Sequence, residues 1–228
     1  MTQTAEIIGL YIGKAVERWE GKGLTAIQKT LCEGRLEIGE NGFVLDEQGD
    51  RTVHGGPEKA IHHYAADHLD FWKQEYPDFA DQFVPGCFGE NISTHGLNED
   101  NLCLGDILSL GTAKVQICQG RQPCWKLTKH TGIKAFAMAF QQTALTGWYY
   151  RVLEPGHVQI GDVMEVLERP QPDWSVRKLT RARFDKNIDP AIAKELAENN
   201  LLAAPWKASF LKKADKAFVE DTSKRLDG

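Results

Sequence analysis

The chain has 228 residues, 42% of them hydrophobic and 26% charged, with a formal net charge of −5, which is an ordinary globular composition. Its longest apolar runs fall far short of the about 20 residues that cross a bilayer. The N-terminus also lacks the basic region and long apolar stretch of a secretory signal. We therefore expect no membrane segment, and five cysteines without a Cys-x-x-Cys pair indicate a reduced, cytoplasmic protein.

Charge divides the chain near residue 170. Residues 170–228 carry 12 Lys and Arg against 9 Asp and Glu, a net charge of +3, whereas residues 1–169 carry 15 against 23, a net charge of −8. The junction at 168–173 holds two prolines in a short polar stretch, which is typical of a linker. We predict two domains, one covering residues 1–169 and the other residues 170–228.

The first domain has the pattern of a β protein. Short apolar runs alternate with Gly-rich turns, and the expected strands are Ile7–Ile12, Gly42–Leu45, Leu102–Leu108, Lys114–Cys118 and Asp162–Leu167. Two helices are expected within this domain, at about Lys59–Tyr76 and Gly132–Ala144. Many short strands with few helices favour a mainly β fold, namely a closed or nearly closed β-barrel.

After the linker the apolar residues recur with a helical period. Val176 and Leu179 lie three residues apart, and Asp189 followed by Pro190 is typical of a helix N-cap with proline at the first helical position. A further helix is expected to carry the apolar residues of 210–218. The tail is therefore predicted to be a small three-helix domain.

The segment Gly120–Lys126 follows an alternating apolar run and contains Cys124. Pro123 has no backbone N–H, so the strand cannot continue there as a paired ladder. Arg121 and Lys126 flank the thiol, and nearby cations favour the thiolate. Two interpretations stay open, a soft metal ligand or nucleophile at the strand end and a buried structural cysteine.

Two glycine-containing loops have the character of ligand-binding turns. His54–Pro57 precedes a predicted helix, and its paired glycines allow close backbone approach and leave N–H groups free for an anion. Phe88–Asn91 is a similar loop, and for both the alternative is a plain turn. We predict no zinc site, because His63 and His68 would point about 140° apart on a helix at 100° per residue. The motifs of nucleotide binding and serine hydrolysis do not occur in the sequence.

Six motifs in one order resemble the MOSC domain, the domain related to the C-terminal part of molybdenum-cofactor sulfurase. They are Asp46–Asp50, Val53–Ala60, Phe88–Ile92, Gly96–Leu97, Gly105–Asp106 and Gln122–Lys126. The resemblance covers nearly the whole chain and is closest to the YiiM type, which adds a short three-helix tail. Leu45 is a departure, since the family usually has glycine before the aspartate.

The resemblance implies a distorted β-barrel in which Cys124 ligates the molybdenum of a pterin cofactor and is the catalytic residue. YiiM-like members reduce N-hydroxylated compounds, including hydroxylaminopurines, with electrons from a separate flavoprotein reductase. A soft thiolate suits molybdenum, and the phosphate of the pterin requires cations and free N–H groups. The residues expected to bind the cofactor are Lys14, His54, Gly55, Gly56, Asn91 and Arg121. No general acid is assigned, and Glu90 and His54 are the candidates.

Two functions other than a reductase are compatible with the sequence. A molybdenum-cofactor or sulfur carrier could use the same Cys124. A nucleic-acid binder would use the basic tail, but a net charge of +3 is small for such a module and the whole chain is acidic, so no nucleic-acid partner is expected. A homodimer is left open.

The basic tail itself has two interpretations. A basic face at Arg177, Lys178 and Arg181 could dock an acidic flavodoxin-like electron donor. Alternatively, the tail covers an apolar face of the barrel, and the residues expected to do so are Trp174, Leu196, Trp206 and Phe210.

Overall fold

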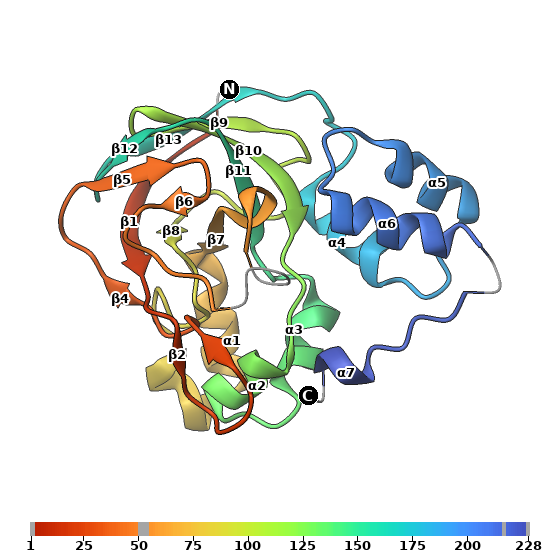
Figure 1. Ribbon diagram of the computed structural model, residues 1–228, viewed down its shortest axis with the longest axis horizontal. Coiled ribbons are helices and arrows are strands. Elements are labelled where there is room, and N and C mark those ends of the chain that lie inside the picture. The colour runs from red at the N-terminus through yellow and green to blue at the C-terminus, as the bar shows by residue number, and fades with distance from the viewer. Residues whose placement is uncertain (1–2, 50–54, 216–217, 227–228) are drawn as a thin grey trace.

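A closed barrel of seven strands forms the body of the protein (Figure 1). The computed structural model describes residues 3–49, 55–215 and 218–226. The strand order is β13-β9-β10-β11-β7-β8-β1, and β1 pairs back with β13 to close the barrel. The pairing is antiparallel except between β7 and β8. The barrel strands are β1 (Thr4–Ile12), β7 (Ile61–Ala65), β8 (Ile92–Thr94), β9 (Ile107–Leu110), β10 (Ala113–Gly120), β11 (Trp148–Glu154) and β13 (Val163–Glu168).

Shorter strands extend the barrel at its rim. β4 (Thr30–Leu31) adds to the end of β1, and β5 (Leu36–Gly39), β6 (Gly42–Phe43) and β12 (Gly156–Val158) form a three-stranded sheet. β2 (Val16–Glu17) and β3 (Leu24–Thr25) form a separate hairpin. At the β5–β6 turn Gly42 has φ 105°, and a Cβ there would lie 1.9 Å from the Ala60 carbonyl oxygen, so only glycine fits.

The barrel interior is apolar. Alternate residues of its strands point inward, among them Ile7, Val115, Ile117 and Trp148, and each is fully buried. Strand alternation therefore produces the core that the sequence pattern predicted, with polar residues on the outer face of strands such as β1.

Helices close one end of the barrel around a second core made of aromatic rings. α1 (Leu69–Glu75), α2 (Trp125–Thr131) and α3 (Phe136–Thr143) contribute to it, together with Ala66 of the 3-10 turn η2 (Ala66–His68). Two further 3-10 turns, η1 (Pro57–Lys59) and η3 (Pro77–Gln82), contribute no residue to this core. The Trp72 ring lies 5.0 Å from Phe136 and 5.5 Å from Phe140 between centroids. Such pairs add about 0.5–1.5 kcal/mol each beyond the burial of their area.

The tail forms a third core at the side of the barrel (Figure 1). α4 (Val176–Phe184), α5 (Pro190–Glu198) and α6 (Ala204–Lys213) pack together, and Asp189 accepts the Ala191 N–H at the start of α5 as the sequence predicted. The four predicted covering residues, Trp174, Leu196, Trp206 and Phe210, are buried here with Leu104 of the barrel domain. These contacts support the covering role of the tail. The boundary at residue 170 stays a prediction.

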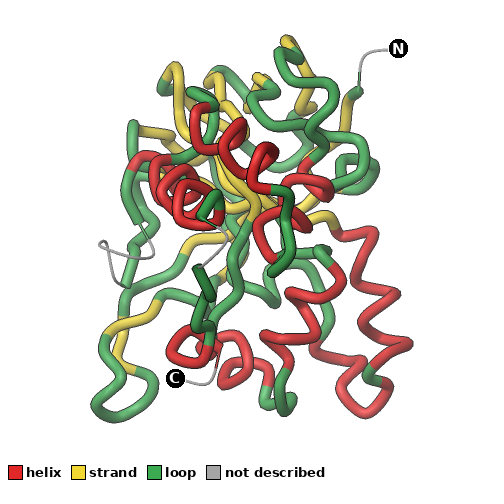
Figure 2. Tube along the Cα trace, turned by 90° about the vertical axis from the view of Figure 1, so that its right-hand side faces the viewer, coloured by secondary structure: helices red, strands yellow, loops and turns green. Residues whose placement is uncertain are grey.

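The chain then leaves the bundle and returns to the closed end of the barrel. α7 (Ser223–Leu226) lies beside α2 and α3, and Leu226 is buried in the aromatic core rather than in the core of the tail (Figure 1). Viewed from the side of the tail, most strands lie in the upper part of the molecule and most helices lie below or in front of them (Figure 2). No helix in the described ranges combines the length and apolar character that a membrane crossing requires.

The structure corrects two predicted helices. The helix expected over Lys59–Tyr76 is wrong for Ile61–Ala65, which form strand β7, and only Leu69–Glu75 are α-helical. All five residues of β7 are buried, so the strand lacks the polar alternation that identifies a half-exposed strand. The last tail helix ends at Lys213, so Phe218 lies beyond it.

Candidate active site

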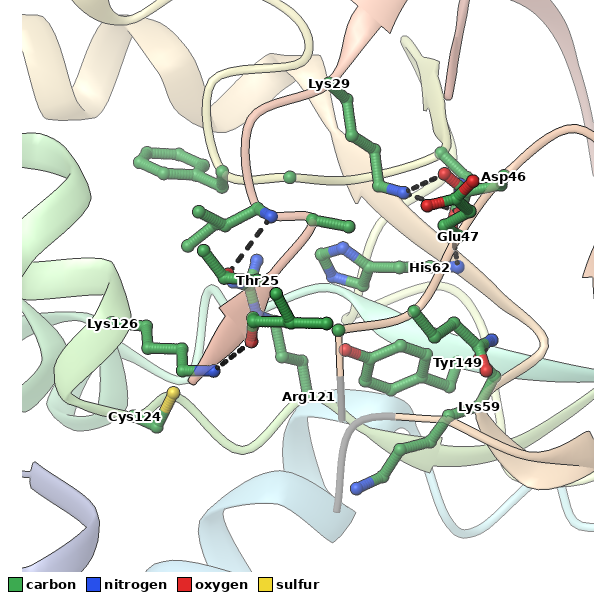
Figure 3. Close-up of a pocket in the computed structure, with 18 of the residues that line it drawn as sticks. Thr25, Lys29, Asp46, Glu47, Lys59, His62, Arg121, Cys124, Lys126 and Tyr149 are labelled. Atoms are coloured by element: carbon green, nitrogen blue, oxygen red, sulfur yellow. Dashed lines mark hydrogen bonds and ion pairs between the residues drawn. The ribbon is translucent and has the colours of Figure 1, made fainter. Parts of the chain in front are cut away.

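A pocket opens where β10 ends and β11 begins. Including the part that is open to solvent, it has about 740 Å³ of empty volume. Segments far apart in the sequence meet in it. Its lining includes Leu24–Ile27, Lys29, Asp46–Gly49, Lys59, His62, Phe88, Gly89, Asn91, Arg121, Gln122, Cys124, Lys126 and Tyr149. Figure 3 shows Cys124 and Lys126 at one end and Lys29 with Asp46 at the other.

Cys124 is held at the junction of a strand and a helix. β10 ends at Gly120, and the Arg121 N–H bonds the Gly147 carbonyl at 2.9 Å. Cys124 is the N-cap residue of α2 and has an extended backbone, and its carbonyl accepts the Leu127 N–H. The side chain is half-buried, is a free thiol and lines the pocket. The predicted strand end therefore leads directly to an accessible sulfur.

Arg121 is a buried cation with spare hydrogen-bonding capacity. The residue is 9% exposed, and among the described residues nothing accepts a hydrogen bond from its buried Nη1 atom. Its guanidinium carbon lies 5.7 Å from the centre of the Phe140 ring. A buried, incompletely paired cation is costly in the isolated protein. An anion in the pocket would supply the missing acceptor.

The far end of the pocket is a buried polar network. Lys29 Nζ contacts both Asp46 oxygens at 2.6 Å, and these two side chains are 7% and 8% exposed. Burial lowers the pKa of Lys29, and the Asp46 carboxylate opposes that shift. Asp46 also accepts from the Gly13 N–H and from Asn91 Nδ2, at 2.6 and 2.8 Å. The carboxylate therefore joins three segments and fixes this wall.

Two rings line the pocket between its ends (Figure 3). His62 on β7 pairs with Tyr149 on β11, and their rings lie 4.9 Å apart between centroids. Burial, and next the Arg121 charge, lower the pKa of His62 well below its ordinary value, so its imidazole is neutral. Burial raises the pKa of Tyr149, so its phenol stays protonated. These rings offer a flat apolar surface and one hydroxyl donor.

The β2–β3 hairpin forms the rim of the pocket nearest Cys124. Lys126 Nζ donates to the Leu24 carbonyl at 2.9 Å, as the dashed line in Figure 3 marks. The Trp19 ring lies edge-on to the Trp125 ring, with centroids 5.6 Å apart. Lys126 thus has a positioning contact in addition to its charge near the thiol.

The structure brings together only part of the predicted cofactor set. Arg121 and Asn91 line the pocket with Cys124, whereas Lys14 lies outside its lining in an exposed ion pair with Glu47, at 2.9 Å. Gly55 and Gly56 also lie outside its lining, and the Gly56 N–H donates to Gln48 Oε1 at 3.2 Å. His54 lies outside the described residues.

Asn91 and Glu90 are occupied by contacts with the protein. The Asn91 amide donates to the Tyr11 carbonyl and to Asp46, and its oxygen accepts the His62 N–H at 3.0 Å. Glu90 is fully buried, does not line the pocket, and accepts from the N–H groups of Gly86 and Phe88. Burial raises the pKa of Glu90, but its position does not favour it as the general acid.

The other cysteines differ from Cys124 in their surroundings. Burial raises the pKa of Cys118 to about 12, and burial also raises the pKa values of Cys87 and Cys103. These side chains are thiols under ordinary conditions, and Cys118 Sγ contacts the Glu58 carbonyl oxygen at 3.1 Å. The role of a buried structural cysteine, one of the two interpretations of Cys124, therefore fits Cys118 better.

His63 and His68 do not share the helix on which the sequence pattern places them. His62 and His63 are consecutive on a strand, so they point to opposite faces, and His68 ends a 3-10 turn. His63 bonds the Tyr150 and Thr94 hydroxyls, and His68 Nε2 lies 2.5 Å from Glu99. In the ranges that the structure describes, no three His, Cys, Asp or Glu residues are grouped so as to hold a metal ion.

Residues 50–165, about half of the chain, match the sequence profile of the MOSC domain. The chain is also 36% identical to Protein YiiM of Escherichia coli (strain K12) over 221 residues, which cover 97% of this chain and 98% of the relative. The chain belongs to the MOSC domain family. It is 35% identical to Uncharacterized protein YflK of Bacillus subtilis (strain 168), covering 92% of this chain and 95% of that protein.

The fold of these MOSC relatives agrees with the barrel described above. The crystal structure of YiiM from Escherichia coli matches with a TM-score of 0.81 and 30% identity, covering 98% of each chain. That of YiiM from Geobacillus stearothermophilus matches with a TM-score of 0.78 and 31% identity, covering 92% of this chain and 99% of the other. The predicted barrel fold and family are thus confirmed.

MOSC domains are generally associated with the molybdenum cofactor. The family therefore indicates a molybdenum-associated function. The pocket residues fit that group in their chemistry. Cys124 offers a soft sulfur, and Arg121 offers an unpaired donor for an oxyanion. The rings of His62 and Tyr149 offer a wall for a flat heterocycle.

Three pocket-lining residues, Lys29, His62 and Tyr149, are not among the site residues predicted from the sequence. The burial of Lys29 depends on Asp46, to which it is joined only by the fold, so no local pattern identifies it. Tyr149 lies in the aromatic run Trp148–Tyr150, which is typical of a strand and could have indicated β11.

Proposed function

We propose that this protein is a molybdenum-cofactor-dependent reductase of N-hydroxylated compounds, such as hydroxylaminopurines, in which Cys124 ligates the molybdenum. The carrying observation is the accessible Cys124 thiol in one pocket with the unpaired Nη1 atom of buried Arg121. A relative from Gibberella moniliformis that is named Reductase adds support. It is 34% identical over 169 residues, which cover 74% of this chain and 30% of that protein.

The bound cofactor would supply the two-electron exchange, and the overall reaction converts an N-hydroxylamine, two electrons and two protons into an amine and water. Arg121 would pair with the cofactor phosphate, and Lys126 would add a second positive charge at the Cys124 end of the pocket. The neutral His62 ring and the Tyr149 ring would hold a flat base. The Tyr149 hydroxyl stays protonated and would donate a hydrogen bond to the substrate.

The electrons would come from a separate flavoprotein reductase, and we place the reaction in the cytoplasm. All five cysteines lie within the described residues and are free thiols, which favours a reducing compartment. The basic tail is a weaker docking surface than its sequence indicates, because Arg177 pairs with Asp100 at 2.5 Å and Lys178 lies over the Trp174 ring. Arg181 remains exposed.

A carrier of molybdenum cofactor or sulfur is the second candidate, because the same accessible thiol could hold sulfur. Protein made in a host that synthesises the cofactor should contain molybdenum and should reduce N-hydroxyadenine with a chemical reductant. Protein from a host unable to synthesise the cofactor is the control. Molybdenum without turnover, or a persulfide on Cys124, would favour the carrier over the reductase.

A further inference from the structure

Gln122 and Pro123 form a short tether that carries Cys124 and has little backbone support of its own. β10 ends at Gly120, and α2 begins at Trp125. Within the described part of the chain, neither Gln122 nor Pro123 makes a backbone-to-backbone hydrogen bond. Pro123 has no N–H to donate. Other groups must therefore fix the tether if the thiol is to keep one position.

The C-terminal helix supplies those groups through Arg225. Arg225 Nη1 donates to the Pro123 carbonyl, and Nη2 donates to Gln141 Oε1 on α3, both at 2.6 Å. With the Gln122 amide turned so that its oxygen faces the arginines, Arg225 Nε also donates to that oxygen at 2.8 Å. One planar guanidinium thus binds both residues before Cys124 and ties them to α3.

Further contacts fix Arg225 before it reaches the tether. Leu226 is buried in the aromatic core, and Asp221 accepts the Ser223 N–H at the start of α7. The guanidinium carbon of Arg225 lies 5.7 Å from the centre of the Phe184 ring. Such restraint lowers the entropic cost of holding a long side chain in one geometry.

A second arginine joins this arrangement to the tail. Arg183 is 5% exposed and makes two hydrogen bonds with the Glu220 carboxylate, each at 2.8 Å. In the same orientation of its amide, the Gln122 oxygen accepts from Arg183 Nη2 at 3.3 Å. α4 and the returning C-terminal segment therefore converge on one pocket-lining residue.

We infer that Arg225 is a positioning residue that fixes the Gln122–Pro123 tether and thereby holds Cys124 in the pocket. The inference rests on the proposed function, because it assumes that Cys124 is the functional thiol. It gives the end of the tail a role distinct from covering the barrel, since the contacts with Pro123 and Gln141 come from Arg225 on α7.

The test compares full-length Arg225→Gln with Arg225→Lys and with Lys194→Gln, which changes an exposed cation of the same tail. In cofactor-free protein, Arg225→Gln should raise amide hydrogen exchange of a peptide covering residues 119–127 by about tenfold, because that segment opens locally. Cys124 alkylation at fixed pH should rise about threefold relative to Cys32, because the thiol becomes more accessible. Arg225→Lys should give intermediate values, since one ammonium can keep the Pro123 contact but lacks the fork.

A second set of measurements uses protein that contains molybdenum. Turnover per bound molybdenum should fall in Arg225→Gln with little change in KM, while Lys194→Gln stays like the wild type. Unchanged exchange and alkylation in Arg225→Gln would overturn the inference, as would a looser tether with unchanged turnover per molybdenum. If the wild type lacks reductase activity, the proposed function fails, but the cofactor-free measurements still decide whether Arg225 holds the thiol.

Discussion

The barrel interior and the pocket differ in how they treat polar groups. The interior is lined by fully buried apolar side chains such as Val115 and Ile117, and its buried His63 makes two hydrogen bonds. The pocket instead buries the cations Lys29 and Arg121, and Arg121 keeps an unpaired donor. Because Arg121 lines the pocket, a ligand bound there can supply the acceptor that its buried Nη1 atom lacks. This difference supports the proposal that the pocket is the functional region.

The two cysteines around the end of β10 repeat this difference at a smaller scale. Cys118 is fully buried, and burial raises its pKa to about 12. Cys124 follows the proline, leaves the strand and lines the pocket as a half-buried thiol. The same residue type is thus structural on the strand and available for chemistry just beyond it.

The largest expected loss of stability comes from breaking the buried pair at the far end of the pocket. Lys29→Met should lower the free energy of unfolding by about 3–5 kcal/mol, because it leaves the Asp46 carboxylate buried without its cation. Urea denaturation measures the loss. Lys73→Met is the matched control, since the exposed Lys73–Asp70 pair should contribute about 0–1 kcal/mol. Equal losses in both variants would contradict the account of the pocket wall.

Acid should destabilise the protein through His63. Burial lowers its pKa to about 3, against about 6.5 in the unfolded chain, so only the unfolded state binds the proton between these values. The contribution of neutral His63 to the free energy of unfolding is fully present above pH 6.5. About 2–3 kcal/mol of that free energy should be lost by pH 4.5. His63→Phe should flatten this pH dependence of unfolding, whereas His95→Gln, at a mostly exposed side chain, should leave it unchanged. An unchanged slope in His63→Phe would show that other groups cause the acid sensitivity.

Arg121→Ala should affect cofactor retention more than chemistry. Removing a charged donor to the phosphate should weaken binding by about 10–100-fold, the equivalent of about 1.5–3 kcal/mol. Molybdenum per protein, measured after gel filtration, should therefore fall, while turnover per bound molybdenum changes less. Lys14→Ala is the informative comparison, because Lys14 lies outside the pocket lining and should retain the cofactor. Normal retention in Arg121→Ala would assign the phosphate to another cation.

The smallest expected effect is a difference in unfolding free energy between variants of two cysteines outside the pocket, the buried Cys118 and the half-buried Cys32. Cys118→Ala should cost about 1–2 kcal/mol of unfolding free energy through lost packing, with reductase activity retained. Cys32→Ala changes a half-buried residue that follows β4, and its unfolding free energy should stay within about 0.5 kcal/mol of the wild type. Thermal denaturation and activity assays measure both. Loss of activity in Cys118→Ala with a normal fold would undo the contrast with Cys124.

Local patterns predicted much of this fold. The alternating runs correspond to β1, β10 and β13, and the Asp189–Pro190 signal marks the start of α5. They failed where both sides of a segment are covered, because β7 is buried throughout and has no polar alternation. α2 was also not predicted, and its start at Trp125 follows directly from the N-cap position of Cys124.

The site was predictable where one segment or one motif of the MOSC resemblance carries it, as for Cys124 and for Asn91. Cys124, Arg121 and Lys126 come from one stretch of sequence and all line the pocket. Lys29 and Asp46 meet across the fold, and Arg225 reaches the Pro123 carbonyl from 102 residues away along the chain. Such contacts depend on tertiary packing, so no local spacing encodes them.

The central claim is that Cys124 is the functional thiol of the pocket. The most direct test is the turnover of Cys124→Ser with N-hydroxyadenine and a chemical reductant, measured beside Cys32→Ser and Cys118→Ser. We predict that Cys124→Ser loses the activity while its thermal midpoint stays close to that of the wild type, because the side chain is half-buried at a pocket wall. We also predict that the other two variants stay active. Full activity in Cys124→Ser would contradict the account.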